Sequence, residues 1–371
     1  MKNKRINRTL AAVLMSATVL ASAPVAGFTA PVVAEAAYKA ENATPVDIFN
    51  GFTATLSKSA EQLYRFNVTK DTVIALTVSS EDNSVSTDVT IKRKINGIYV
   101  NVKGYRYTDS NNLRQYYYNL PADNSPYLIC LKGPFTEETV GITATKMKDV
   151  SNHITSAKEI KMGKLAAGQL YTEDDNDYFK FNSGKYNLIK IQATSENWAS
   201  NDYSVYKDTS GKAASLVGSF RYNDLGGDTE VSNYIRVTPH KTYYVKVNRW
   251  NGDPKEYSFK VKGFMDVSDS AKTAKSVKMG KTVKGKIEVK EDVDYYVVKA
   301  TKTGMAKLSC SSSGLFASEI EVYRKGSAKK LFAGYISPSG NEAKFKVQKN
   351  KSYIVKVIGK STGSTYSFKL K

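Results

Sequence analysis

Short runs of alternating apolar and polar side chains follow one another along most of the chain. Examples are "LYRFNV" from Leu63, "YYVKV" from Tyr243 and "TYSFKL" from Thr365, and the runs are rich in Val, Ile, Tyr and Phe. An alternation with a period of two residues is typical of strands that bury one face. Turn-forming residues such as Asn96-Gly97 separate the runs, and no amphipathic helical pattern follows the N-terminal apolar segment. The pattern therefore predicts an all-β protein.

The alternating runs belong to a unit that is repeated along the chain. The segment "DVSNHITSAKEIKMGK" from Asp149 matches "DVSDSAKTAKSVKMGK" from Asp266, at an offset of 117 residues. A more diverged first copy aligns with the second through "LYRFNVTKDTVIALTV" at 63–78, at an offset of 115 residues. Periods of this length correspond to whole domains, so we predict three tandem jelly-roll-like β-sandwich domains. Their predicted boundaries are 37–147, 148–264 and 265–371.

The N-terminal segment has the organisation of a secretory signal peptide. Basic residues within 2–8 precede an apolar run, and Ala34-Glu35-Ala36 fits a small-residue cleavage site. Pro24 and Gly27 make the run short for a membrane span, although an uncleaved anchor is the alternative. We expect residues 1–36 to be removed. The mature protein is then secreted, either extracellular or associated with the cell wall, and has no membrane span.

Several sequence blocks recur in the same order in the copies. An acidic–aromatic block reads "DNDYFKF" at 175–181 and "DVDYYVV" at 292–298, and it is followed later by "YYVKV" at 243–247 and "EYSFKV" at 256–261. These blocks resemble the bacterial pre-peptidase C-terminal domain family. The resemblance implies a jelly-roll-like β-sandwich of a kind often appended to secreted peptidases, with calcium bound in some relatives. In the first copy, alanine and glutamine stand where the family has aspartates.

The acidic–aromatic blocks carry the candidate metal ligands Asp175, Asp177, Asp292 and Asp294. One interpretation is a turn cap, because Asp side chains accept hydrogen bonds from nearby backbone N–H groups. The other is a calcium site, because this ion prefers clustered oxygen ligands. A catalytic acid–base pair would need a second carboxylate group converging from elsewhere, and the sequence shows none. No other catalytic motif occurs, so we predict a protein that is not an enzyme, with calcium as its candidate cofactor.

The two cysteines align with different positions of the repeat. Cys310 corresponds to apolar inward positions of the other copies, whereas Cys130 corresponds to Lys246 and Lys356 on the outer face. Secreted domains that depend on disulfides contain many more cysteines. We therefore expect two isolated thiols.

Three aromatic residues are candidate ligand contacts. Trp250 lies in the predicted hairpin between the last two strands of the second copy, and Trp198 follows a predicted strand. Tyr117 belongs to "YYYN", in which consecutive tyrosines on opposite strand faces should leave at least one exposed to solvent. A tryptophan at a loop tip offers a large contact area at low entropic cost. The alternative is that it folds back over the sandwich edge.

Positive charge is concentrated in the third copy. The formal net charge is +20; residues 37–148 contain 13 basic and 11 acidic residues, 149–265 contain 16 and 14, and 266–371 contain 22 and 9. Polar positions alternate outward in strands, so many of these lysines should share a surface. The candidate binding lysines are Lys278, Lys281, Lys284, Lys286, Lys329 and Lys330. This surface is either a solvated face or an attachment site for an anionic polymer.

These features together predict a secreted non-catalytic binding or adhesion protein. The expected partner is an anionic cell-wall polymer or an extracellular polysaccharide or protein, and not nucleic acid, because no base-recognition platform accompanies the lysines. One alternative is an accessory or substrate-targeting subunit of an extracellular hydrolase. Another is an enzyme with an unrecognised site. The sequence does not identify the ligand or the oligomeric state.

Overall fold

A computed structural model describes the chain from residue 40 onward. The described residues are 40–80, 85–108, 114–171, 175–195, 200–209, 212–223, 230–251, 255–267, 269–289, 291–314 and 317–371. The predicted signal peptide at 1–36 lies outside them, and so does Trp198. No helix within the described ranges is long and apolar enough to cross a membrane.

The first copy forms two five-stranded sheets, in the orders β1-β3-β9-β5-β6 and β2-β10-β4-β8-β7. A single turn of 3-10 helix, η1 (Ala40–Asn42), precedes them. The strands are β1 Thr44–Pro45, β2 Phe52–Leu56, β3 Glu61–Phe66, β4 Thr72–Ser80, β5 Asp88–Ile95, β6 Ile98–Asn101, β7 Tyr105–Thr108, β8 Arg114–Leu120, β9 Tyr127–Lys132 and β10 Glu138–Lys146.

The second copy forms sheets in the orders β11-β13-β18-β15-β16 and β12-β19-β14-β17. Its single turn of 3-10 helix is η2 (Ile154–Ser156). The strands are β11 Lys158–Glu159, β12 Leu165–Leu170, β13 Asn176–Asn182, β14 Leu188–Ser195, β15 Ser200–Thr209, β16 Lys212–Asn223, β17 Val231–Arg236, β18 Thr242–Asn251 and β19 Lys255–Phe264.

The third copy repeats this arrangement, in the orders β20-β22-β27-β24-β25 and β21-β28-β23-β26. Its single turn of 3-10 helix is η3 (Ala271–Thr273). The strands are β20 Lys275–Lys278, β21 Thr282–Lys286, β22 Val293–Lys299, β23 Gly304–Ser312, β24 Ser318–Arg324, β25 Lys330–Tyr335, β26 Asn341–Val347, β27 Ser352–Gly359 and β28 Thr365–Leu370.

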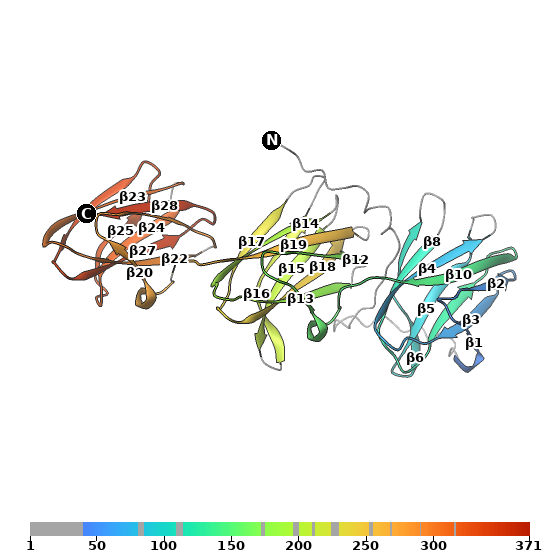
Figure 1. Ribbon diagram of the computed structural model, residues 1–371. Helices are drawn as coiled ribbons and strands as arrows, with labels where there is room; N and C mark the ends of the chain where they lie inside the picture. Colours follow the sequence, from blue (N-terminus) through green and yellow to red (C-terminus); the bar gives the residue numbers. More distant parts are fainter. Residues whose placement is uncertain are drawn as a thin grey trace. The chain divides into compact units, whose positions relative to one another are not determined.

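Each copy has the strand order of a jelly roll. In the third copy, for example, the chain passes between its two sheets so that β22 neighbours β27 (Figure 1). In the other sheet, β21 neighbours β28. Two nested Greek keys of eight strands produce this order. A short additional strand joins in parallel at one edge, as β20 does beside β22. The structure therefore confirms the predicted all-β, jelly-roll-like fold class.

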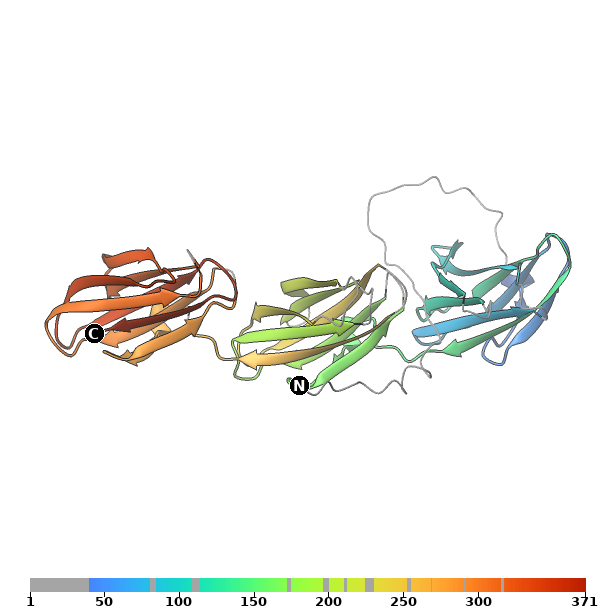
Figure 2. The ribbon, with the colours of Figure 1, turned by 90° about the horizontal axis from the view of Figure 1, so that it is seen from above.

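The core of each copy lies between its two sheets, which appear as two layers for the third copy in Figure 2 (orange to red). Alternate residues of β13 and β22 are buried, as the sequence pattern predicts. Phe179 of β13 packs edge-on against Phe259 of β19, with ring centroids 5.0 Å apart. Removing such apolar surface from water is the main favourable contribution to folding.

The described chain divides into two compact units, and their boundary passes through the second copy. One unit contains residues up to 182 with 192–232 and 241–261, and the other contains 183–191, 233–240 and 262–371. The three predicted domain boundaries therefore stay a prediction, although each copy has its own pair of sheets.

Two local expectations are confirmed. Asn96 and Gly97, between β5 and β6, have φ values of 51° and 87°, the left-handed conformation that a tight hairpin turn requires. Both cysteines are thiols outside any disulfide bond, and both are buried. Cys310 lies in the core of the third copy, whereas Cys130 belongs to a separate small cluster on the outer face of the first.

Candidate functional site

Three carboxylates of the second copy converge at the edge of its sandwich, and we call them the Asp177 centre: Asp149, Asp175 and Asp177. One oxygen from each lies within 4.8 Å of the others. Asp175 and Asp177 are 1% and 0% exposed, and Asp149 is partly buried. Such a grouping of buried acidic side chains is costly unless protons or cations neutralise it.

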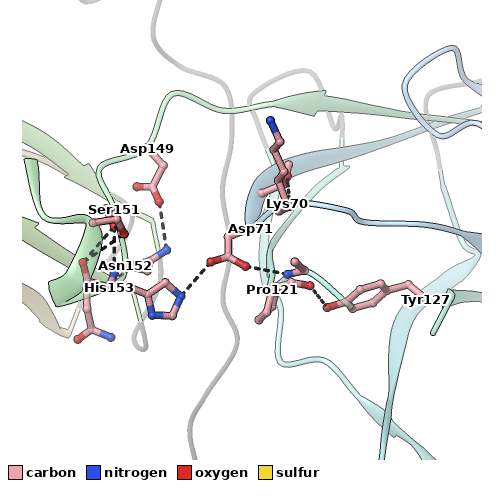
Figure 3. A network of polar contacts seen from close by, with 12 residues as sticks. Lys70, Asp71, Pro121, Tyr127, Asp149, Ser151, Asn152 and His153 are labelled. Carbon is pink, nitrogen blue, oxygen red and sulfur yellow. Dashed lines mark hydrogen bonds and ion pairs between the residues drawn. The ribbon is translucent and has the colours of Figure 1, made fainter. Parts of the chain in front are cut away.

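Asp149 reaches this centre because the segment before η2 pairs with the start of β13. The Tyr178 backbone N–H donates to the Ser151 carbonyl oxygen at 2.9 Å, and the Asn176 N–H donates to Asn152 Oδ1 at 3.0 Å. Asn152 also donates from Nδ2 to Asp149 Oδ2 at 3.1 Å, as Figure 3 shows. The "DVSN" segment at 149–152 is thus held against the strand that carries Asp177.

Asp177 points into the sandwich, where the Tyr257 hydroxyl donates to its Oδ2. Gly168 of β12 lies opposite Tyr257 of β19 in the sheet. A Cβ atom at Gly168 would lie 2.4 Å from both the Tyr257 hydroxyl and Asp177 Oδ2. Glycine therefore leaves the space in which the phenol reaches the carboxylate. Gly285, Tyr366 and Asp294 repeat this arrangement in the third copy.

The remaining oxygens of the Asp177 centre have no protein partner. Asp175 accepts from the Tyr171 N–H at 2.8 Å through Oδ2, but Oδ1 of each of the three aspartates is buried without a hydrogen bond. Burial, together with the neighbouring Asp175 carboxylate, raises the pKa of Asp149 to about 8. Burial also raises the pKa of Asp175 to about 7 and that of Asp177 well above its ordinary value.

Three carboxylates of the third copy form the Asp292 centre: Asp266, Asp269 and Asp292. Asp266 and Asp292 correspond to Asp149 and Asp175 in the repeat, whereas Asp269 takes the place of Asn152. Arg236, which belongs to the same compact unit, forms ion pairs with Asp269 and Asp292. Asp292 also accepts from the Glu288 N–H at 3.1 Å. A guanidinium group therefore already offsets one negative charge of this centre. Burial raises the pKa of Asp294 to about 7, and its Oδ2 accepts from Tyr366 instead.

The Asp177 centre fits a calcium ion better than the Asp292 centre does. Calcium takes six to eight oxygen ligands, largely carboxylates and carbonyls. Each of the three aspartates brings one oxygen to the centre and has one buried oxygen without a hydrogen bond. These carboxylates would supply part of that set, and the ion would remove the repulsion between them. In the Asp292 centre, the positive charge of Arg236 opposes a second cation.

The structure corrects the turn-cap interpretation for two of the four predicted residues. Asp175 and Asp292 do each accept a backbone N–H bond from the residue four positions earlier. Asp177 and Asp294 lie within β13 and β22, where the alternation directs them into the core. The sequence reading also missed Asp149 as a member of the centre. The signal was present, because Asp149 and Asp266 occupy equivalent positions of the repeated "DVS" segment.

Figure 3 also shows a contact that the sequence did not suggest. His153 Nε2 lies 2.9 Å from Asp71 Oδ2, and Asp71 Oδ1 accepts from the Ala122 N–H at 2.7 Å. The side chains of His153 and Asp71 are 59% and 45% exposed. An ion pair between groups so exposed adds little to stability.

The aromatic predictions have different outcomes. The expected exposure of a tyrosine in "YYYN" is wrong, because Tyr117 is only 6% exposed and its two neighbours are also buried. The rings of Tyr105 and Tyr107 on the edge strand β7 pack on Tyr117, with centroids 6.2 and 6.5 Å away. Trp250 falls within β18, and its side chain lies outside the described residues.

The predicted lysines do not share one surface. Lys278 lies on β20 and Lys330 on β25, at opposite edges of one sheet, whereas Lys284 lies on β21 of the other sheet. Lys281 and Lys329 are exposed next to these strands, and Lys286 is half-buried. The six lysines therefore do not all belong to one surface, because strand order, which alternation does not reveal, separates these positions. That many of the lysines of this copy share a surface stays a prediction.

No protein-family model matches the chain, nor does any curated protein sequence. Among solved structures, it is similar to "Crystal Structure of Tripeptidyl Peptidase 2 (TPP II)", with 8% sequence identity and a TM-score of 0.23. The alignment covers 88% of this chain and 32% of that chain, so this chain spans about a third of the length of that protein. A likeness at this TM-score carries no argument about fold or function.

Proposed function

We propose that the protein is a secreted, non-catalytic binding protein, built of pre-peptidase C-terminal-like modules, whose third copy attaches it to an anionic cell-wall or extracellular polymer. One observation carries the proposal. Residues 266–371 contain 22 basic and 9 acidic residues, a net charge of +13, whereas the counts for each of the other copies leave +2. A charge excess confined to one part of a chain concentrates its field there and attracts polyanions.

The positions of these charges support the proposal. Lys278, Lys281 and Lys284 are exposed, as are Lys344 and Lys346 on β26. Because the cations occur on both sheets, a long polyanion can contact several of them whichever sheet it approaches. Attraction of this kind depends on the summed charge more than on any one contact, and salt screens it.

Retention of the chain, without its predicted signal peptide, on beads carrying an anionic wall polymer tests the proposal. We expect retention at low salt and release near 1 M salt, where the screening length falls from roughly 10 Å at 0.1 M to roughly 3 Å. Beads carrying an uncharged polymer are the control. Equal retention on the uncharged beads, or retention that salt does not affect, would contradict the proposal.

A second part of the proposal concerns the Asp177 centre. We propose that it holds a divalent cation, with calcium as the best fit, and that the ion has a structural role. The three unpartnered buried oxygens support it. Asp149 precedes η2 and Asp177 lies in β13, so an ion shared by them would hold the segment entering the second copy against its sandwich. Its predicted effect on stability is developed in the Discussion.

A further inference from the structure

The outer face of one sheet in the third copy carries an aromatic and basic surface. Tyr295 of β22, Lys356 of β27 and Glu321 of β24 lie side by side in register. In the neighbouring row, Ile354 of β27 lies beside Tyr323 of β24. Both tyrosines are half-buried. Their rings and the Ile354 side chain therefore form an apolar floor beside the Lys356 ammonium group.

Two loops border this floor and make it a groove of about 460 Å³. Lys272 of η3 stands on one side. Arg324 at the end of β24 and Lys325 in the turn that follows it stand on the other. With Lys356, four cations line the groove, and no acidic residue is among its lining residues. The groove therefore complements a ligand that has both a flat apolar face and negative charge.

Glu321 holds the floor in place from beside the groove. It forms ion pairs with Lys330 and, at 3.3 Å, with Lys356, and it accepts a hydrogen bond from the Tyr323 hydroxyl. Burial alone would raise the pKa of Glu321, but these hydrogen bonds lower that pKa to about 2. Glu321 is consequently ionised at neutral pH and fixes the position of one ring and one cation. Such preorganisation reduces the entropic cost of binding.

The corresponding faces of the other two copies lack either the exposed floor or part of the charged borders. In the first copy, Cys130 and Leu128 take the positions of Lys356 and Ile354, and Ala43 packs over them. The face is thus covered.

In the second copy, tyrosines and a lysine recur on the corresponding floor, with Tyr178 beside Lys246 and Tyr206 beside Tyr244. The charged borders recur only in part. At the repeat offset of 117 residues, Lys207 stands for Arg324, but Thr155 stands for Lys272 and Asp208 for Lys325.

We infer that the groove of the third copy binds an acidic polysaccharide, with a sugar ring against Tyr295 or Tyr323 and its carboxylate groups near the four cations. This inference deepens the proposed function and rests on it. A uronic acid combines an apolar ring face with one negative charge per sugar. Aromatic side chains provide such a contact surface, and arginine binds carboxylate groups in a bidentate manner.

An acidic peptide is the less suitable occupant because the floor offers no free strand edge. β22 is paired on both sides, with β20 and β27, and β24 is paired with β27 and β25. An extended peptide binds most readily by adding a strand to an exposed edge. Recognition in this groove therefore depends on side chains, and the ligand must offer ring faces and charges.

The test measures binding of the full chain, without its predicted signal peptide, to polygalacturonate at low salt. We expect two groove variants, Tyr295→Ala with Tyr323→Ala and Lys272→Thr with Lys325→Asp, each to weaken binding about tenfold or more. The second variant introduces residues that the second copy already carries in the same fold. Its matched control, Lys344→Thr with Lys346→Asp, removes the same charge from exposed positions of the other sheet. It should weaken binding by only about threefold, which is the part that the summed charge contributes. Thermal melting of each variant confirms folding.

Each other result overturns the inference in a distinguishable way. An equal loss in the Lys344/Lys346 variant would show that the charge excess alone binds the polymer, and the proposed function would stand without the groove. Binding of polyglutamate that depends on the tyrosines as strongly would assign the groove to acidic peptides. Equal binding of fully methyl-esterified polygalacturonate would exclude recognition of the carboxylate groups. Failure of the unaltered chain to bind any anionic polymer would overturn the proposed function as well.

Discussion

Replacement of Asp177 by asparagine should stabilise the cation-free protein at pH 8 and abolish its response to calcium. Asparagine keeps a side-chain oxygen that can accept from the Tyr257 hydroxyl, and it removes one of the three carboxyl groups that repel one another when ionised. Most substitutions of a buried hydrogen-bonded residue destabilise a protein. A gain in stability is therefore a distinctive outcome.

The size of the expected gain in the free energy of unfolding follows from the spacing of the carboxylates. Two unit charges 4.8 Å apart repel by about 3.5 kcal/mol at an effective dielectric constant of about 20. Bound protons relieve part of this repulsion, since burial raises the pKa of Asp149 to about 8 and that of Asp175 to about 7. We therefore expect Asp177→Asn to raise the free energy of unfolding at pH 8 by about 1–3 kcal/mol in the absence of calcium.

The pH dependence has a definite sign. A carboxyl group whose pKa is higher in the folded than in the unfolded chain binds its proton more tightly when folded. The stability that these protons contribute is complete below about pH 4 and is lost as the pH rises through about 7 to 8. The cation-free protein should thus be more stable at pH 5 than at pH 8. Calcium should reverse the loss, because it binds the ionised carboxylates.

Urea unfolding followed by tryptophan fluorescence measures the stability of the second copy, which contains the Asp177 centre. The protein has two tryptophans, Trp198 and Trp250, and both belong to the second copy. Calcium at about one hundred times its dissociation constant should stabilise the unaltered protein by about 2.7 kcal/mol and leave Asp177→Asn unchanged. Asp294→Asn in the third copy is the matched control and should retain the calcium response. A variant at Asp177 that is less stable than the unaltered protein in EDTA at pH 8, or that calcium stabilises equally, would refute the reasoning.

Three further outcomes are expected. Gly168→Ala should lower the free energy of unfolding in urea by about 1–3 kcal/mol, because the added Cβ atom would displace the Tyr257 ring. A loss below about 0.5 kcal/mol would contradict this close packing. The low pKa of Glu321 contributes stability that is present above pH 4.5 and is lost as the pH falls towards 2. Acid unfolding followed by the circular dichroism of the tyrosines should therefore depend less steeply on pH in Glu321→Gln. An unchanged pH dependence would exclude this contribution. Burial raises the pKa of Cys310 to about 11 and Cys130 is also buried, so both thiols should react with a thiol reagent at pH 8 only after unfolding, and rapid labelling of the native protein would oppose this.

The fold was largely predictable from sequence because its determinants are local or repeated. Alternation with a period of two identifies strands such as β13 and β22 without knowledge of their neighbours. The repeat then shows that the same set of strands occurs more than once. The inward position of Cys310 followed from comparison of aligned strands. The conformation of Asn96-Gly97 also depends on only a few adjacent residues.

The candidate sites were less predictable because their members meet across the sandwich. The buried position of Tyr117 depends on the rings of an edge strand, which the pattern of its own strand does not contain. The lysines that were expected together lie on different sheets. The groove in the third copy depends on Tyr295 and Tyr323, which become neighbours only because β27 lies between their strands.

The sequence by itself determined the strand periodicity, the repeat and the uneven distribution of charge, since each is a property of residues near one another in the chain or of a simple count. Only the tertiary structure decided that Asp177 points into the core towards Tyr257, which is 80 positions away, and that Asp149 joins it. The physical reason is that alternation specifies which residues share a face but not which strands become neighbours. Strand order follows from burial of the whole apolar surface, and it places the carboxylates, the tyrosines and the lysines relative to one another.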